Sequence, residues 1–381
     1  MRWTPEHELF RSTVREFVDS EIVPHVDAWE EAGDMPLHDV FGQMGKLGFL
    51  GLEYDAEFGG GGADHSYTVI LGEELGRVNT CSFSMAAGVQ TDMATPSLAR
   101  FGTPELKKKY LAPALAGEMV ASIAVSEPDA GSDVASIRTR AVRDGDEWVI
   151  SGQKLWITNG TQSDWLCLLA RTSDDPGYRG MSQIVVPTDV AGFSVSKKLD
   201  KLGMRASDTA WLTFDEVRVP LANTIGEAGR GFQQQMRQFQ AERMILNYNA
   251  IGAMKEALTR TGEYTRERQL FGGPLAAQQY VPYTLAELAA EVRAFEALCH
   301  ACAEAYIAGD NTDRDTTVCK FLCGRLVRKV ADWCVQFHGG MGYVEENWPA
   351  RFYRDARLYG IGGGADEVML RTLARTDGFS L

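Results

Sequence analysis

Val120-Ala121-Ser122-Ile123-Ala124-Val125 is the stretch at which the pattern of the chain changes. It is short, apolar and rich in β-branched residues, and a loop with proline and glycine follows it, which favours a strand. Asp144-Gly145-Asp146 then separates two strand-like runs, which is a hairpin signal. Residues 120–228 are therefore predicted to form a β domain. Its further β-rich runs lie at residues 165–170, 181–187 and 210–220.

The chain on both sides of this β domain has the apolar spacing of α-helices. Thr4 is a suitable N-cap before Pro5, and apolar residues recur at helical spacing from Leu9 to Ile22. From Gly231 onward four long helical segments predict a bundle. We therefore expect an α+β multidomain protein. Its predicted parts are an N-terminal helical domain (residues 1–119), the central β domain (120–228) and a C-terminal four-helix bundle (229–381).

Composition excludes several classes of protein. Hydrophobic residues make up 45% and charged residues 24% of 381 residues, as in ordinary globular chains. The formal charge of −14 argues against nucleic-acid and anionic-membrane surfaces, which need clustered lysine and arginine. No apolar run approaches the length of a membrane span, and the first residues resemble neither a secretory signal nor a transit peptide.

The seven cysteines are an odd number spread over a long chain, which indicates a reducing compartment and a cytoplasmic protein. Cys299-x-x-Cys302 and Cys319-x-x-x-Cys323 have spacings that suggest zinc. Both pairs lie in predicted helices, and no further ligand follows at zinc-finger spacing. We therefore interpret them as small residues on helix faces and predict no metal site.

The loop at residues 124–133 carries hydroxyl groups suited to a polar ligand. Pro128 and Gly131 set a turn, and Ser126 and Ser132 stand beside backbone N–H groups. Such neutral donors can hold a heteroaromatic edge or a phosphate oxygen. The alternative is an ordinary surface turn.

Trp156-Ile157-Thr158 ends a predicted strand before an Asn-Gly turn. An indole can stack on a flat ring while the neighbouring hydroxyl binds the edge of that ring. The alternative is a tryptophan of the core.

Together with two later motifs, these loops resemble the acyl-CoA dehydrogenase flavoprotein family over nearly the whole chain. The later motifs are Arg268-Gln269-Leu270-Phe271-Gly272 and Gln336-Phe337-His338-Gly339-Gly340-Met341-Gly342-Tyr343. The resemblance implies the helical–β–bundle fold and FAD as cofactor. The cofactor-binding residues that it implies are Val125, Ser126, Gly131, Ser132, Trp156, Ile157, Thr158, Arg268, Phe271, Gln279, Gln336, Gly339, Gly340, Ala365 and Glu367.

The chemistry of the later motifs agrees with an anionic cofactor. Arg268 can bind a pyrophosphate by charge-assisted hydrogen bonds, and Gly339 and Gly340 let the backbone approach a ligand closely. In the family this arginine and Phe271 reach the FAD of a neighbouring subunit, so the resemblance implies a homo-oligomer, a tetramer above all. The alternative for Arg268 is a salt bridge at a helix end, and we interpret His338 as a packed core histidine.

The catalytic base is the main departure from the family pattern. Most members carry a glutamate near the C-terminus, where this chain has Gly363, and glycine cannot accept a proton. The long-chain and isovaleryl branches place their glutamate on a helix before the Arg-x-x-Phe-Gly motif, which here matches Glu242, 26 positions before Arg268. We predict Glu242 as the base; the alternative is a solvated carboxylate or a partner of Arg243. The predicted substrate-binding residues are Ser132, Phe239, Arg243, Gly363 and Gly364.

The resemblance implies an FAD-dependent α,β-dehydrogenation of an acyl-CoA thioester to the trans-2-enoyl thioester, with electrons passed to electron-transfer flavoprotein. Residues 362–369 and Glu242 resemble long-chain and citronellyl-CoA-type members, which suggests a medium-chain, long-chain or methyl-branched acyl group. The alternatives are a dehydrogenase of acyl-carrier-protein thioesters, a flavin oxidase or monooxygenase on the same fold, and an FAD-binding scaffold without activity.

Overall fold

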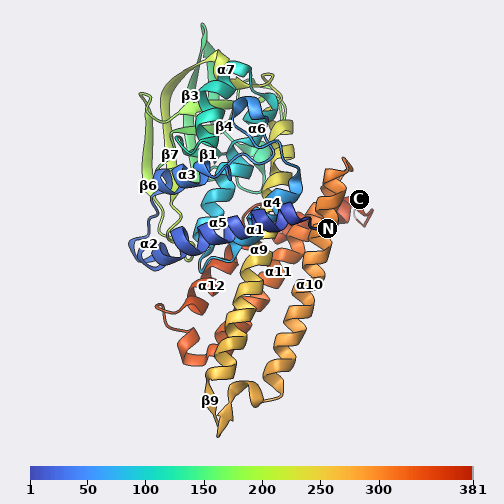
Figure 1. Cartoon of the computed structure of the whole chain (residues 1–381). Helices are drawn as coiled ribbons and strands as arrows, with labels where there is room; N and C mark the ends of the chain where they lie inside the picture. Colours follow the sequence, from blue (N-terminus) through green and yellow to red (C-terminus); the bar gives the residue numbers. More distant parts are fainter. Residues whose placement is uncertain (380–381) are drawn as a thin grey trace.

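The structure is a computed structural model that describes residues 1–379 (Figure 1). Helices at both ends of the chain flank a central sheet, which confirms the predicted order. Thr4 caps the first helix by accepting a hydrogen bond from the His7 N–H. The N-terminal helices are α1 (Pro5–Phe17), α2 (Val26–Ala32), α3 (Leu37–Lys46), α4 (His65–Gly76), α5 (Cys81–Gly88), α6 (Pro96–Phe101), α7 (Pro104–Leu106) and α8 (Ala112–Leu115).

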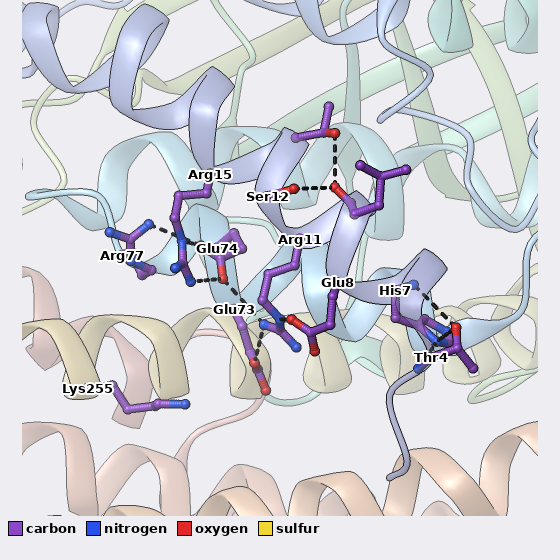
Figure 2. A network of polar contacts seen from close by, with 12 residues as sticks. Thr4, His7, Glu8, Arg11, Ser12, Arg15, Glu73, Glu74, Arg77 and Lys255 are labelled. Carbon is purple, nitrogen blue, oxygen red and sulfur yellow. Dashed lines mark hydrogen bonds and ion pairs between the residues drawn. The ribbon is translucent and has the colours of Figure 1, made fainter.

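Ion pairs fasten α1 to α4 (Figure 2). Arg11 of α1 lies 3.1 Å from a carboxylate oxygen of Glu73, and Arg15 lies 2.8 Å from Glu74. Arg77 approaches the other oxygen of Glu74 at 3.1 Å. Both carboxylates are buried, so the arginines supply the counter-charges that burial requires. The network holds the first helix against the part of the N-terminal domain that packs on the C-terminal helices.

The central strands form one eight-stranded sheet in the order β6-β7-β3-β2-β4-β5-β8, with β1 pairing to β4. The predicted hairpin is present: Asp144 pairs with Glu147, and Gly145 and Asp146 make the turn. β6 was not predicted, because this edge strand is short and mostly exposed and ends in two lysines. The strands are β1 (Ala121–Ala124), β2 (Arg140–Asp144), β3 (Glu147–Thr158), β4 (Trp165–Arg171), β5 (Met181–Pro187), β6 (Phe193–Lys198), β7 (Thr209–Pro220) and β8 (Thr224–Ile225).

The C-terminal region is a helical bundle with three long helices and two short ones. The long helices have 37, 28 and 26 residues. The sequence predicted a fourth long segment, but glycine runs after α11 and before α13 interrupt it, and the shorter α12 and α13 pack on α11 instead. The helices are α9 (Gly231–Glu267), α10 (Tyr280–Ile307), α11 (Asp313–His338), α12 (Trp348–Ala356) and α13 (Asp366–Thr376).

Helix α9 runs from the sheet to the far tip of the molecule (Figure 1). At its start Arg230 forms a β-bridge with Met181 of the sheet. At its end the two-stranded β9 (Gln269–Leu270) and β10 (Gly273–Pro274) form the tip. A helix of this length spans about 55 Å, so its two ends belong to different neighbourhoods. Within residues 1–379, none of the helices combines the length and apolar character that a membrane span requires.

The paired cysteines of α10 and α11 lie in the largest apolar core. Cys299, Cys302, Cys319 and Cys323 are all buried among apolar residues of α9, α10 and α11. Burial raises the pKa of Cys323 to about 12. The thiolate that a metal ligand requires is therefore disfavoured at this position.

Candidate functional site

The loop after β1 is fastened to β3 by a buried ion pair. Lys154 of β3 is fully buried and lies 2.9 Å from a carboxylate oxygen of Glu127, and it also donates to the Val125 carbonyl at 2.8 Å. The Leu155 N–H donates to the Ser126 carbonyl at 2.9 Å. These bonds hold the loop beside the end of β3, where Trp156 and Thr158 follow. The two predicted cofactor loops are therefore neighbours in space.

The polar groups of these loops are free for a ligand. Within residues 1–379 the hydroxyls of Ser126, Ser132 and Thr158 take part in no hydrogen bond. Gly131 and Ser132 are exposed, whereas Val125 and Ile157 are buried and support the loops from below. An edge lined by unused hydroxyls suits a heteroaromatic ring with several polar atoms.

Trp156 is turned out of the strand by a β-bulge. Its φ is 68°, the register of β3 with β7 shifts between Leu155 and Ile157, and 61% of its surface is exposed. A positive φ at a bulky residue costs about 1–3 kcal/mol, and bulges re-aim side chains next to active sites. The alternative of a core tryptophan is wrong, and the exposed indole is available for stacking.

Helix α9 brings Phe239 and Glu242 to these loops. Phe239 packs with Val125 and Ala130, and Glu242 lies one turn further along the helix. Glu242 is half-buried, and burial raises its pKa to about 7, while the charges of Arg243 and Lys320 lower it. A carboxylate with this pKa can accept a proton near neutral pH.

Gly363 lies directly against this carboxylate. A Cβ atom at Gly363 would lie 3.4 Å from Oε1 of Glu242 and 2.7 Å from Cδ1 of Leu246. The backbone at Gly363 has φ +65°, which favours glycine. No residue among 1–379 accepts a hydrogen bond from the Gly363 N–H. Glu242 and Gly363, the two candidate positions for the base, therefore lie side by side in this chain.

Arg243 holds the glycine loop and does not pair with Glu242 by a hydrogen bond. Its Nε donates to the Gly363 carbonyl at 3.2 Å. Gly364 is half-buried with φ +107°, and Ala365 precedes α13, where Glu367 is exposed. Gly363, Gly364 and Ala365 belong to the turn before α13, and Glu367 lies in the first turn of that helix.

The remaining predicted cofactor residues lie at the opposite end of α9. Phe271, 90% exposed, is at the tip, and Arg268 is exposed and forms no ion pair within residues 1–379, which removes the salt-bridge alternative. His338, at the end of α11, stacks on Tyr264 of α9 at 4.1 Å between ring centroids. The neighbouring motif residues are therefore close to this end as well. Exposed there are Gln279, Gln336, Gly339 and Gly340.

His338 is a packed histidine, as predicted. It is buried between Tyr264 and Trp348, and its Nδ1 hydrogen bonds to the Cys334 carbonyl at 2.7 Å. Burial lowers its pKa, so the neutral ring is favoured.

The two groups of residues cannot meet within one chain. Phe239 contacts the flavin-type loops, and Arg268 follows 29 residues later on the same helix, about 43 Å away. An arginine side chain does not cover that span. Within one chain the two groups of residues therefore belong to separate places.

Three family models match the chain in order: the acyl-CoA dehydrogenase N-terminal domain at residues 4–118, the middle domain at 122–217 and the C-terminal domain at 229–376. The chain belongs to the acyl-CoA dehydrogenase family. The mouse mitochondrial long-chain specific acyl-CoA dehydrogenase is 35% identical over 98% of this chain and 86% of its own. The potato mitochondrial isovaleryl-CoA dehydrogenase is 33% identical over 96% and 89%. The crystal structure of an acyl-CoA dehydrogenase from Geobacillus kaustophilus superposes with a TM-score of 0.95, at 37% identity and 98% coverage of both chains.

Acyl-CoA dehydrogenases are FAD-dependent oxidoreductases that act on the CH–CH bond of acyl-CoA, which makes this chain such an enzyme. The unused hydroxyls, the exposed indole and the unpaired arginine fit FAD. Sequence reasoning missed one charged residue beside the Gly363 turn, the buried Lys320 of α11. Its signal was available: it is a lysine three and four residues from Thr317 and Gly324, on the face of the helix that is buried.

Proposed function

We propose that Glu242 removes the α-proton of an acyl-CoA thioester while the β-hydrogen leaves as hydride, giving the trans-2-enoyl thioester. The observation that carries this proposal is the 3.4 Å approach of Glu242 Oε1 to the Cβ direction of Gly363. In most family members the base stands at the Gly363 position, so Glu242 delivers a carboxylate to the same place from α9. A pKa raised to about 7 by burial suits a base that works near neutrality.

The Gly363 N–H stabilises the thioester oxygen as negative charge develops on it. Glycine retains this donor, and it has no partner within residues 1–379. Arg243 orients the donor because it holds the Gly363 carbonyl at 3.2 Å. Stabilisation of the enolate oxygen makes the α-proton more acidic.

FAD, when bound, supplies the acceptor for the hydride. The residues that would hold its ring system are those of the two loops on the sheet side. Trp156 would stack on the ring, Ser126 and Thr158 would bind its polar edge, and the buried Val125 and Ile157 would support it. Ser132 and Gly131 stand at the exposed rim of the same loop, towards the substrate.

A cavity at the start of α9 supports CoA over acyl carrier protein as the carrier. It has a volume of about 480 Å³ and contains Tyr178, Arg179 and Arg230 together with the carboxylate of Asp175. Tyr178 contacts Phe232, which packs in the same apolar cluster as Phe239. An aromatic ring and two guanidinium groups suit the base and phosphates of a nucleotide. From Phe232 to Glu242 α9 rises about 15 Å, a distance that an extended pantetheine arm can bridge.

The acyl group is proposed to be medium-chain, long-chain or methyl-branched, as in citronellyl-CoA. Gly362, Gly363 and Gly364 bring no side chain to the wall opposite Glu242, which leaves space at the β-carbon. The relatives named above include long-chain and isovaleryl enzymes, which supports the same range. We further propose electron-transfer flavoprotein as the electron acceptor and a cytoplasmic location.

We propose that the FAD site is completed between subunits of a homo-oligomer, a tetramer in the simplest case. Arg268 and Phe271 project from a tip that lies about 43 Å along α9 from the loops of the same chain. They, with Gln279, Gln336, Gly339 and Gly340, are assigned to the cofactor of a neighbour. Ala365, in the turn beside Gly363, and Glu367, in the first turn of α13, are assigned to the cofactor as well. Closed symmetry is the common way to repeat such an interface.

The test is anaerobic mixing of the purified yellow protein with a panel of acyl-CoA thioesters, followed by flavin absorbance. We expect bleaching with medium-chain, long-chain or methyl-branched substrates and none with the matching acyl-carrier-protein thioester. Peroxide formation in air would favour the oxidase alternative. No bleaching with any thioester, or a folded protein that ignores added FAD, would leave the scaffold alternative and refute the proposal.

A further inference from the structure

A lysine lies buried behind the proposed base. Lys320 of α11 has no exposed surface, and no carboxylate among residues 1–379 lies within ion-pair distance of it. Its Nζ donates hydrogen bonds to the carbonyls of Tyr359 at 2.6 Å and Gly364 at 3.3 Å. A cation without a counter-ion is costly to bury. Apolar residues of equal volume would fill the same space at lower cost, so the lysine calls for an explanation.

Lys320 and Glu242 face each other across the glycine turn. A Cβ atom at Gly363 would lie 3.2 Å from Cε of Lys320 and 3.4 Å from Oε1 of Glu242. The two side chains are therefore no more than about 7 Å apart at these atoms, a distance at which charges interact in a protein interior. Arg243 of α9 holds the Gly363 carbonyl, and Lys320 of α11 holds the next one. Two cations on two helices thus fasten consecutive peptide units.

Several other charged groups lie near Lys320 and Glu242. Arg243 follows Glu242 on α9. Burial lowers the pKa of Arg243, and the negative charges of Glu242 and Asp313 act against that effect. Burial lowers the pKa of Lys320, and the charge of Arg243 lowers it as well. Cys323 on its own helix, Asp366 of α13 and Glu242 act in the opposite direction and favour the charged ammonium group. Asp366 is paired with Arg328 at 2.7 Å. The positive charge of Lys320, on α11, lowers the pKa of the Glu242 carboxyl group, which burial raises.

We propose that Lys320 is a positioning residue for the dehydrogenation: its ammonium group fixes the Gly363–Gly364 backbone and keeps a positive charge beside the Glu242 carboxylate. The charge favours the ionised carboxylate that can take the α-proton, against the effect of burial. The two carbonyl bonds hold the turn that carries the Gly363 N–H. The inference rests on Glu242 as the proposed base.

The experiment measures the rate of flavin reduction by acyl-CoA in single turnovers from pH 5.5 to 10. In the wild type the rate should rise with pH as Glu242 loses its proton, with the midpoint of this rise near pH 7. This rising part of the pH profile is called the limb below. Lys320→Met keeps the volume and removes the charge. From Coulomb's law at about 7 Å, we expect the limb to move up by about one to two pH units. A purely structural loss would lower the rate at every pH and leave the limb in place.

Two variants on the same helix serve as controls. Lys320→Arg keeps the charge, and its limb should stay at the wild-type pH even if its maximal rate falls. Lys329→Met makes the same chemical change at a partly exposed residue paired with Glu291, and both its limb and its maximal rate should match the wild type. If Lys320→Met does not fold, Lys320→Gln retains a donor for one carbonyl without charge and carries the same expectation.

A second measurement reads the carboxyl group directly. The infrared C=O band of protonated Glu242, identified by its loss in Glu242→Gln, should titrate at higher pH in Lys320→Met than in the wild type. If Glu242→Gln reduces flavin slowly but the limb and the band of Lys320→Met stay at wild-type pH, the role of Lys320 is refuted and the base stands. If Glu242→Gln reduces flavin at the wild-type rate, the proposed base itself is wrong.

Discussion

Replacing Glu242 by glutamine tests the proposed base most sharply. The amide has the size of the carboxylate, so the packing beside Gly363 remains while the proton acceptor is lost. Loss of a positioned general base typically lowers the chemical step about 10²–10⁴-fold. We expect FAD content and substrate binding to be retained and flavin reduction, followed by stopped-flow absorbance, to slow by at least about 100-fold. Reduction at the wild-type rate would mean that the base lies elsewhere.

The same prediction extends to moving the carboxylate across the turn. In the Glu242→Gln background, Gly363→Glu places a carboxylate where most of the family carries it, and we expect part of the activity to return. The return should be incomplete, because a side chain at φ +65° costs about 1–2 kcal/mol and its Cβ would lie only 2.7 Å from Leu246 Cδ1. Gly363→Gln in the same background is the matched control without a base. Equal rates for the two double variants, with substrate bound in both, would show that the positions do not reach the same proton.

Three further outcomes are expected. In the wild type, the rate of flavin reduction should rise with pH through about 7 and level off above it. Burial raises the pKa of Glu242, and only the ionised carboxylate accepts a proton. A rate independent of pH from 5.5 to 8.5 would contradict this. Arg268→Gln should bind FAD weakly. Mixed oligomers with Glu242→Gln subunits should regain active sites, since one subunit supplies the base and its neighbour supplies the arginine. Absence of activity in the mixed oligomers would mean that both residues act within one chain. Arg230→Gln should raise the KM for acyl-CoA several-fold and leave the KM for the acyl-pantetheine fragment unchanged; an equal effect on both would remove the nucleotide end of CoA from this cavity.

Much of the fold followed from local patterns. The limits of β4 and β5 and the hairpin at Gly145 were predicted because apolar strands between turn residues are a local signal. The edge strand β6 was missed, since most of it is exposed and pairing with β7 holds it in place. The fourth long helix was expected from periodicity, and glycine-rich turns replaced it with shorter ones. Local propensity thus predicted elements well where their own residues are buried.

The sequence by itself determined the family resemblance, the cofactor and the two candidate positions for the base. It did so because motifs are identified residue by residue, and Gly363 has no side chain that could accept a proton. It also predicted that Arg268 would act in a neighbouring subunit, but only through the resemblance.

Only the tertiary structure decided how these residues meet. Glu242 and Gly363 are far apart in the chain, yet a Cβ at Gly363 would lie 3.4 Å from Glu242 Oε1, because α9 and α13 both pack against α11. The bulge at Trp156 depends on the register between β3 and β7. The burial of Lys320 beside Glu242 depends on where three helices close around one turn. Such distances arise from packing between distant segments, so the periodicity of apolar residues along one segment does not predict them.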